Sequence, residues 1–256
     1  MKQYNTIEIF DNGPLVILKL NRPEKRNALN DEMVAELQDF FTYLKDESDA
    51  VVLNLVAKGS VFCAGADIDW LYSLKDASKE QISTSFSELG KMLFMLKELP
   101  QITVAMVHGA AYGGGIGLFA ACDFAISAPN TTFSFSEIKL GLVPATISPY
   151  VLERVGRSKT TKLFLTGEKF DEKRAAQIEL IDEVANPDMQ AVNYQTLIEL
   201  LLTQPRHALR EMKQLFKLVD SGEVSSKKYK KASNIIADLI HTEETQKLFN
   251  RFLTKS

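Results

Sequence analysis

The sequence predicts an α/β protein on three observations. Short runs of aliphatic and β-branched residues alternate with stretches whose apolar residues recur every three or four positions, the period of a helix face. Glycine-containing loops connect a predicted strand to a predicted helix more than once. After Pro149 the helical period continues to the end of the chain. Repeated strands and helices followed by helices alone indicate an α/β core with a helical region after it.

The first elements are a β-hairpin and a helix. Residues 6–10 and 15–20 are rich in strand formers, and the Asn-Gly between them favours a tight turn. A polar loop over residues 21–30 leads to a helix that begins near Asp31. Its apolar residues at helical spacing are Met33, Val34, Leu37, Phe40, Phe41 and Leu44. Residues 51–56 are apolar except for Asn54, as expected of a strand buried on both faces.

The same order then repeats. The sequence predicts a helix from about Asp67, a longer one over residues 78–99, a buried strand over 103–107 and a short apolar helix over 116–121. Two short strands are expected at residues 124–127 and 132–135. Because no linker rich in Pro, Gly or Ser is present, we expect a core of residues 1–160 packed against a helical region of residues 161–256.

Composition excludes several classes of protein. The 256 residues are 45% hydrophobic and 25% charged, and the net charge of −3 gives no electrostatic reason to bind nucleic acid. The most apolar stretch, residues 102–127, contains His108 and Asp123 and so does not fit a membrane span. The first residues lack the apolar segment of a signal peptide, and Cys63 and Cys122 fit buried free thiols. We therefore expect a cytoplasmic, soluble protein.

Three segments carry residues suited to chemistry. Residues 60–68 connect a strand to a helix, and backbone N–H groups at a helix start can bind an anionic oxygen. Gly113, Gly114 and Gly115 stand at a second such junction, where glycines allow a ligand to approach the backbone. Glu137 follows a short strand. Taken alone, the glycine segment fits a packing turn and Glu137 fits a surface residue. Two backbone amides that converge on one point, however, form an oxyanion hole.

The order of these segments resembles the crotonase (enoyl-CoA hydratase/isomerase) superfamily over essentially the whole chain. Residues 21–29 are similar to its CoA-binding loop, residues 62–67 to its first oxyanion segment, residues 110–115 with 121–123 to its second, and residues 133–144 to the segment that carries a catalytic glutamate. The resemblance implies a superhelix of ββα units with a C-terminal helical trimerisation region, assembled as a homotrimer or a dimer of trimers.

The resemblance also implies the site. The substrate would be an acyl-CoA, so coenzyme A is part of the substrate and no separate cofactor or metal is expected. Glu137 would move protons, and the amides of Ala66 and Gly114 would bind the thioester oxygen. Residues implied to contact the substrate or its CoA are Lys25, Arg26, Ala28, Ala64, Asp67, Ile68, Trp70, Gly113, Gly117 and Lys255. Trp70 and its neighbours Leu71 and Tyr72 fit either the wall of the acyl pocket or the core.

One departure from the family pattern bears on the reaction. Gly117 stands where hydratases with two glutamates carry the first of them, so Glu137 is left alone. A single carboxylate suffices to move a proton between C2 and C4, which is isomerase chemistry. Hydration ordinarily uses one group to activate water and another to protonate C2, and a single glutamate can do both only if the proton it takes from water is passed on to C2. We expect a lyase that hydrates a 2-enoyl-CoA; the alternatives are a Δ3,Δ2-enoyl-CoA isomerase, a dehydratase acting on a carrier-protein thioester, and a non-catalytic acyl-CoA binder.

The substrate is suggested by residues 144–150. Together with Gly117 they resemble bacterial methylglutaconyl-CoA and carboxygeranoyl-CoA hydratases, of leucine and acyclic-terpene breakdown. A substrate with its own carboxylate would be repelled less by a site with one glutamate. Burial beside Phe133, Phe135 and Leu140 is expected to raise the pKa of Glu137.

The remaining polar candidates have structural interpretations. Asp67 and Asp123 lie at strand–helix junctions and fit caps, and His108 fits a packed histidine as well as a group near the thioester. No spacing typical of metal ligands is present.

Overall fold

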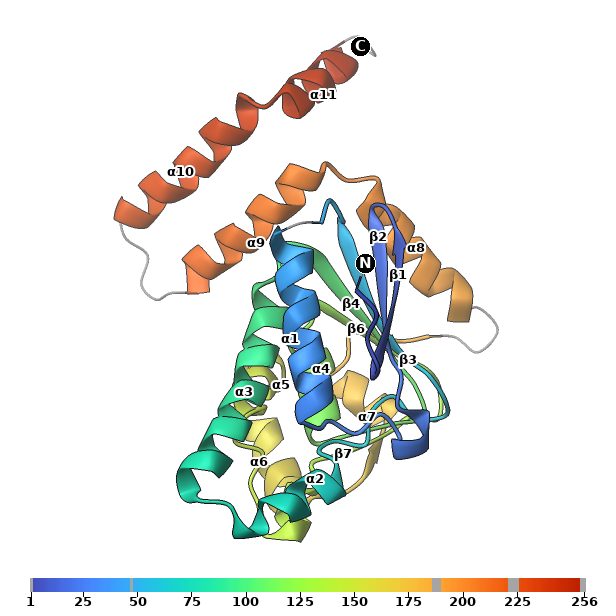
Figure 1. Ribbon diagram of the computed structural model, residues 1–256. Coiled ribbons are helices and arrows are strands. Elements are labelled where there is room, and N and C mark those ends of the chain that lie inside the picture. Colours follow the sequence, from blue (N-terminus) through green and yellow to red (C-terminus); the bar gives the residue numbers. More distant parts are fainter. Residues whose placement is uncertain (1, 47, 186–189, 221–225, 254–256) are drawn as a thin grey trace.

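The computed structural model describes residues 2–46, 48–185, 190–220 and 226–253 (Figure 1). Its larger sheet has six strands in the order β1-β2-β3-β4-β6-β9, and its smaller sheet has the order β5-β7-β8. The larger sheet contains β1 (Ile7–Asn12), β2 (Leu15–Leu20), β3 (Val52–Ala57), β4 (Ile102–Val107), β6 (Phe124–Ser127) and β9 (Glu183–Val184). The smaller contains β5 (Ala110–Tyr112), β7 (Thr132–Ser134) and β8 (Phe170–Asp171). From β2 to β9 every pair in the larger sheet is parallel, so helices must cross between the strands.

The predicted hairpin is confirmed. Asn12 pairs with Leu15 across a two-residue turn in which Gly13 takes a φ of +72°. That angle is in the left-handed region that glycine adopts without a steric cost. The turn therefore begins one residue later than the Asn-Gly pattern suggests, because Asn12 still belongs to β1.

The helices and 3-10 turns follow in chain order. They are η1 (Pro23–Lys25), α1 (Asp31–Asp46), α2 (Ile68–Ser73), η2 (Leu74–Asp76), α3 (Lys79–Glu98), α4 (Gly114–Ala120), η3 (Ser136–Leu140), α5 (Ser148–Val155), α6 (Arg157–Thr166), α7 (Glu172–Gln177), α8 (Gln190–Leu202), α9 (Arg206–Asp220), α10 (Ser226–Ile240) and α11 (Glu243–Leu253). The six apolar residues that predicted α1 are all buried. Ser78 caps α3 with a reciprocal capping box to Gln81, which explains why that helix begins where the sequence indicates.

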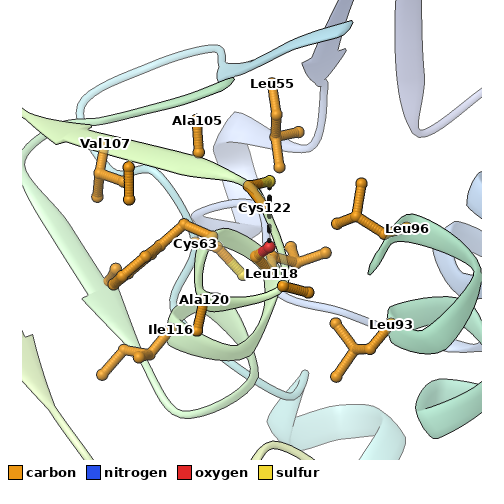
Figure 2. Close-up of a cluster of buried hydrophobic side chains, with 14 of the residues drawn as sticks. Leu55, Cys63, Leu93, Leu96, Ala105, Val107, Ile116, Leu118, Ala120 and Cys122 are labelled. Atoms are coloured by element: carbon orange, nitrogen blue, oxygen red, sulfur yellow. Dashed lines mark hydrogen bonds between the residues drawn. The ribbon is translucent and has the colours of Figure 1, made fainter. Parts of the chain in front are cut away.

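The core lies on both faces of the larger sheet. On one face Leu55 of β3 and Ala105 of β4 pack against α3 and α4, whose Leu93 and Leu118 point into the same cluster (Figure 2). On the other face Val104 packs against apolar residues of α8. Strands buried on both faces carry continuous apolar residues, which is why residues 51–56 showed no alternation.

The expected boundary at residue 160 falls inside α6, and two strands after it join the core sheets. Phe170 of β8 pairs with Phe133, and Val184 of β9 pairs with Ser127. The core thus continues to Val184. Two-residue strands have no periodicity, so the sequence pattern could not reveal them. The three-residue β5 was hidden in the same way inside the expected glycine loop.

The C-terminal helices attach to the core through α8 and α9, while α10 and α11 extend away from the sheet (Figure 1). The buried Lys213 on α9 donates to Asp123 Oδ2 at 2.8 Å and to the Gln101 carbonyl at 2.9 Å. Met212, Phe216 and Val219 of α9 are exposed apolar side chains. Assembly through this region into trimers stays a prediction. No helix in the described ranges is long and apolar enough to cross a membrane.

Candidate active site

One cavity of about 550 Å³ brings the three predicted segments together. Its wall contains Ala66 of the first segment, Gly113 and Gly114 of the second, and Glu137 of the third. The loop before α1 and the N-terminal part of α2 line the same cavity. Residues far apart in the chain therefore meet at one place, as the order of the motifs predicted.

Two backbone amides in this wall have no acceptor within the described residues. The N–H groups of Ala66 and Gly114 make no hydrogen bond there. A Cβ placed on Gly114 would lie 3.9 Å from the Ala66 nitrogen, so the two amides are close neighbours. Gly114 is the first residue of α4, where a backbone N–H has no intrahelical partner. The arrangement provides two donors for a single oxygen atom.

Gly113 makes the turn that presents the second amide. It adopts φ +45° and ψ −116°, which side chains of L-residues rarely allow. Its own N–H donates to the Ser134 carbonyl at 3.1 Å, which ties the turn to β7. A Cβ at this position would lie only 2.8 Å from Glu137 Oε1. The glycine therefore serves both the turn and the close approach of the carboxylate.

Glu137 is held at the cavity wall by η3. Its carboxylate is half-buried, and Oε2 is buried without a hydrogen-bond partner among the described residues. Burial raises the pKa of Glu137, as expected, because the charged form loses hydration. Phe133 and Phe135 are buried in the core and do not line the cavity, whereas Leu140 lines it and is exposed. The carboxyl thus lies close to the two amides in a weakly polar setting.

Gly117 does not line the cavity. It is buried within α4, and a Cβ there would lie 2.3 Å from Ile147 Cγ2 and 3.4 Å from Leu93 Cδ1. Ile147, itself almost fully buried, reaches the cavity wall in its place. The space beside Gly117 is filled by hydrocarbon and has no room for a second carboxylate or for water.

The expected CoA contacts divide into three groups. Those that line the cavity are Lys25, Arg26, Ala28, Ala64, Asp67, Ile68 and Gly113. Trp70 does not line the cavity. Its ring is buried and packs against Phe86 with centroids 5.5 Å apart, so Trp70 belongs to the core and not to the pocket wall. Lys255 lies outside the described residues. Lys25 already pairs with Asp69 at 2.7 Å, whereas Arg26 forms no ion pair within the described chain.

Sequence reasoning missed most of the apolar wall. Leu71 lines the cavity, in agreement with the pocket interpretation of residues 70–72. The wall residues that were not assigned to it are Phe86, Leu89, Leu140, Leu142, Val143, Pro144, Ala145, Thr146 and Ile147. Phe86 and Leu89 look like ordinary buried positions of an amphipathic helix, so no pattern distinguishes them from core. The run from Leu140 to Ile147 was singled out by its motif but not assigned to a wall.

The other polar candidates are structural. Asp67 caps α2 by accepting from the Asp69 amide, and Asp123 accepts from both the amide and the hydroxyl of Thr103. His108 Nε2 contacts the Gly59 carbonyl at 2.9 Å. Burial raises the pKa of Cys63 to about 12, so this thiol is not a nucleophile. The described residues include no His, Cys, Asp and Glu cluster that could hold a metal ion.

Comparisons with known proteins show the family and the fold of the chain. Residues 11–256 match the family described as enoyl-CoA hydratase/isomerase. YhaR of Bacillus subtilis (strain 168), whose name places it among the enoyl-CoA hydratases and isomerases, is 31% identical over 83% of this chain and 82% of its own. The bacillaene synthase dehydratase PksH of the same organism is 30% identical over 70% of this chain and 68% of its own. The crystal structure of an enoyl-CoA hydratase from Shewanella pealeana ATCC 700345 has a TM-score of 0.92 at 32% identity, covering 99% of this chain and 95% of that one.

Proposed function

Because this chain belongs to the enoyl-CoA hydratase/isomerase family and has the crotonase fold, we propose that it adds water reversibly to the C2–C3 double bond of a 2-enoyl-CoA. The observation that carries the proposal is a half-buried carboxylate, Glu137, in the same cavity wall as the free amides of Ala66 and Gly114. The amides bind the thioester oxygen, and the carboxylate faces the carbons next to it.

Glu137 performs both proton transfers in this proposal. Its ionised carboxylate takes a proton from water as the water oxygen bonds to C3. The electron pair of the double bond moves toward the thioester oxygen, where the amides stabilise the enolate. Each such donor is typically worth about 3 kcal/mol in the transition state. The carboxyl then returns the proton to C2, and one water has been added. Its raised pKa suits this cycle, because a stronger base accepts the proton of water more readily.

A second candidate is the Δ3,Δ2-enoyl-CoA isomerase. The observation that favours it is the packing of Ile147 and Leu93 against Gly117, which leaves no place for a second acid or base. Moving one proton from C2 to C4 requires Glu137 alone and no water.

Absorbance assays separate the two reactions. Hydration of a 2-enoyl-CoA removes the absorbance of the conjugated thioester, whereas isomerisation of a 3-enoyl-CoA creates it. We expect faster turnover of the 2-enoyl substrate. Turnover of the 3-enoyl substrate without any hydration would contradict the lyase proposal and support the isomerase. Binding of CoA without either reaction would indicate a non-catalytic acyl-CoA binder.

We further propose a branched or carboxylated acyl group, such as methylglutaconyl. Most side chains that line the cavity are apolar, and of its acidic residues Asp67 and Asp69 pair with Arg22 and Lys25, whereas Glu137 forms no ion pair within the described residues. Leu140, Leu142 and Val143 are exposed at its rim, so the end of an acyl chain can reach solvent and keep a carboxylate hydrated. We expect methylglutaconyl-CoA to be turned over faster than crotonyl-CoA. A strong preference for crotonyl-CoA would contradict this assignment. Carrier-protein thioesters, suggested by the name of PksH, can be tested in the same assay.

A further inference from the structure

The amide of Ala66 is oriented by the loop before α1. The Leu29 N–H donates to the Gly65 carbonyl at 2.7 Å, and the Asp67 N–H donates to the Leu29 carbonyl at 2.8 Å. The Gly65 carbonyl and the Ala66 N–H belong to one planar trans peptide group, so they point in opposite directions. Fixing that carbonyl on Leu29 therefore aims the Ala66 N–H away from the loop, on the side of the cavity.

A second peptide group, between Ala28 and Leu29, connects Arg22 to this arrangement. The Arg22 guanidinium donates through Nη1 to the Ala28 carbonyl at 2.5 Å. The Ala28 carbonyl and the Leu29 N–H again belong to one peptide group. A chain of hydrogen bonds thus runs from the guanidinium through peptide 28–29 and peptide 65–66 to the cavity. Hydrogen bonds in such a chain polarise one another, and a cation at its start strengthens the donor at its end.

Arg22 is itself fixed in place. Its Nη2 donates to Asp67 Oδ2 at 2.9 Å, and the two side chains are 14% and 8% exposed. Asn27, fully buried, accepts the Arg22 backbone N–H at 2.9 Å and donates to the carbonyls of Lys58 and Val61. Arg22 is not among the residues that line the cavity. Its contacts are with the protein, whereas its neighbour Asp67 lies at the cavity wall.

We propose that Arg22 is a positioning residue for the oxyanion hole, acting through peptides 28–29 and 65–66 to aim and polarise the Ala66 N–H. The inference rests on the proposed function, because it requires a thioester oxygen at that amide. It differs from a general stabilising role, since it specifies which bond of the substrate responds when the guanidinium is removed.

The carbonyl of a bound thioester reports this effect directly. Butanoyl-CoA, which has no double bond to hydrate, can be labelled with ¹³C at its thioester carbonyl and its infrared stretch measured when bound. Donation from two amides lowers the stretching frequency relative to the same compound in water. We expect Arg22→Gln to lose a large part of this lowering. With a 2-enoyl-CoA, its kcat should fall roughly 10- to 100-fold, a little less than the loss of one whole donor, while KM changes less than kcat.

Arg154→Gln is the matched control. The Arg154 guanidinium is 12% exposed and likewise joins a carboxylate, Asp182, to backbone carbonyls, including that of Cys122 at 2.7 Å. Its carbonyl partners, on Ala120, Cys122 and Asp123, lie at or beyond the end of α4 opposite to the Gly114 amide, and it makes no hydrogen bond to Ala66 or Gly114. We expect it to lower the unfolding temperature but to keep the full frequency lowering. Arg22→Lys retains the charge but lacks the two guanidinium nitrogens that reach Ala28 and Asp67 at once. Its lowering of the carbonyl stretching frequency should be intermediate between those of Arg22→Gln and the wild type.

Each outcome decides one question. If the carbonyl stretching frequency is lowered as much in Arg22→Gln as in the wild type, the proposed role of Arg22 is wrong. If the glutamine variant does not fold, the same result in Arg22→Lys leads to the same conclusion. A partial lowering in Arg22→Lys, with full lowering in Arg154→Gln, supports the proposed role. If bound butanoyl-CoA shows no lowering in the wild type, the oxyanion site of the proposed function is wrong, whatever Arg22 does.

Discussion

The two segments that present the oxyanion amides are built differently. Around Ala66, orientation comes from tertiary contacts: a β-bridge to Leu29 and the buried pair of Arg22 with Asp67. Around Gly114, it comes from the local backbone, through the positive φ of Gly113 and the start of helix α4, whose residues after Gly114 are buried. The first segment therefore depends on charge and hydrogen bonding across the molecule. The second depends on conformations that only glycine adopts readily.

This difference predicts which substitutions harm each segment. A change of charge should affect the Ala66 side, and a change of backbone freedom should affect the Gly114 side. Glu137 approaches the second segment closely, since a Cβ on Gly113 would be within 2.8 Å of its Oε1. The carboxylate thus depends on the glycine turn and not on the ion pair.

The largest effect is expected from Glu137→Gln. The amide keeps the size of the side chain but cannot accept a proton from water, so kcat should fall about 10³-fold or more. The measurement is steady-state hydration of a 2-enoyl-CoA alongside a binding titration with CoA. Binding of CoA should be unchanged, because residue 137 keeps its size and the cavity residues expected to contact CoA, such as Lys25 and Arg26, remain. A rate near that of the wild type would remove Glu137 from the mechanism.

Gly113→Ala should be next. The new Cβ would strain the backbone and push against the Glu137 carboxylate, displacing both the second amide and the base. We expect kcat to fall about 100-fold, the typical cost of losing one oxyanion donor. Gly13→Ala is the control, because Gly13 also has a positive φ but has open space around it. It should lower stability and leave kcat unchanged; equal kcat values for the two variants would refute the comparison.

Asp67→Asn should have a smaller effect on the first segment. Asparagine can still accept from the Asp69 amide and cap α2, but it removes the charge that faces Arg22. Because a charge-assisted hydrogen bond is about twice as strong as a neutral one, we expect a kcat loss of roughly threefold to tenfold. Asp67→Ala, which removes the cap of α2 as well, should lower kcat further. A loss as large as that of Gly113→Ala would mean that the ion pair supports more than one amide.

The smallest effect concerns stability. Burial raises the pKa of Glu137 above its ordinary value of 4.5, so the folded protein binds this proton more tightly than the unfolded chain. Ionisation therefore costs stability as pH rises through the interval from 4.5 to the raised pKa. Glu137→Gln avoids that cost. Its unfolding temperature should match the wild type below pH 4.5 and exceed it at neutral pH. A variant that is less stable at neutral pH would contradict the burial of an unpaired carboxyl.

Much of the architecture could be predicted from the sequence. Helix α1 followed from six apolar residues at helical spacing, and the start of α3 from Ser78. Strands β5, β8 and β9 could not, because two or three residues show no periodicity. For the same reason the core extends beyond residue 160.

The site was predictable where the motifs are local. Glu137, Ala66 and Gly114 line one cavity, as their order implied. Gly117 and Trp70 do not, because their surroundings depend on Ile147 and Phe86, which are distant in the chain. The pair of Arg22 with Asp67 joins residues 45 positions apart, and no spacing rule connects them.

Exchange of the α-protons of butanoyl-CoA in D₂O, followed by NMR, tests the central claim most directly. It requires only the two amides to stabilise an enolate and one base to remove the C2 proton, whether the natural reaction is hydration or isomerisation. The account predicts exchange in the wild type, a large loss in Glu137→Gln, and a smaller loss in Arg22→Gln. Exchange that persists undiminished in Glu137→Gln, or that is absent from the wild type, would contradict it.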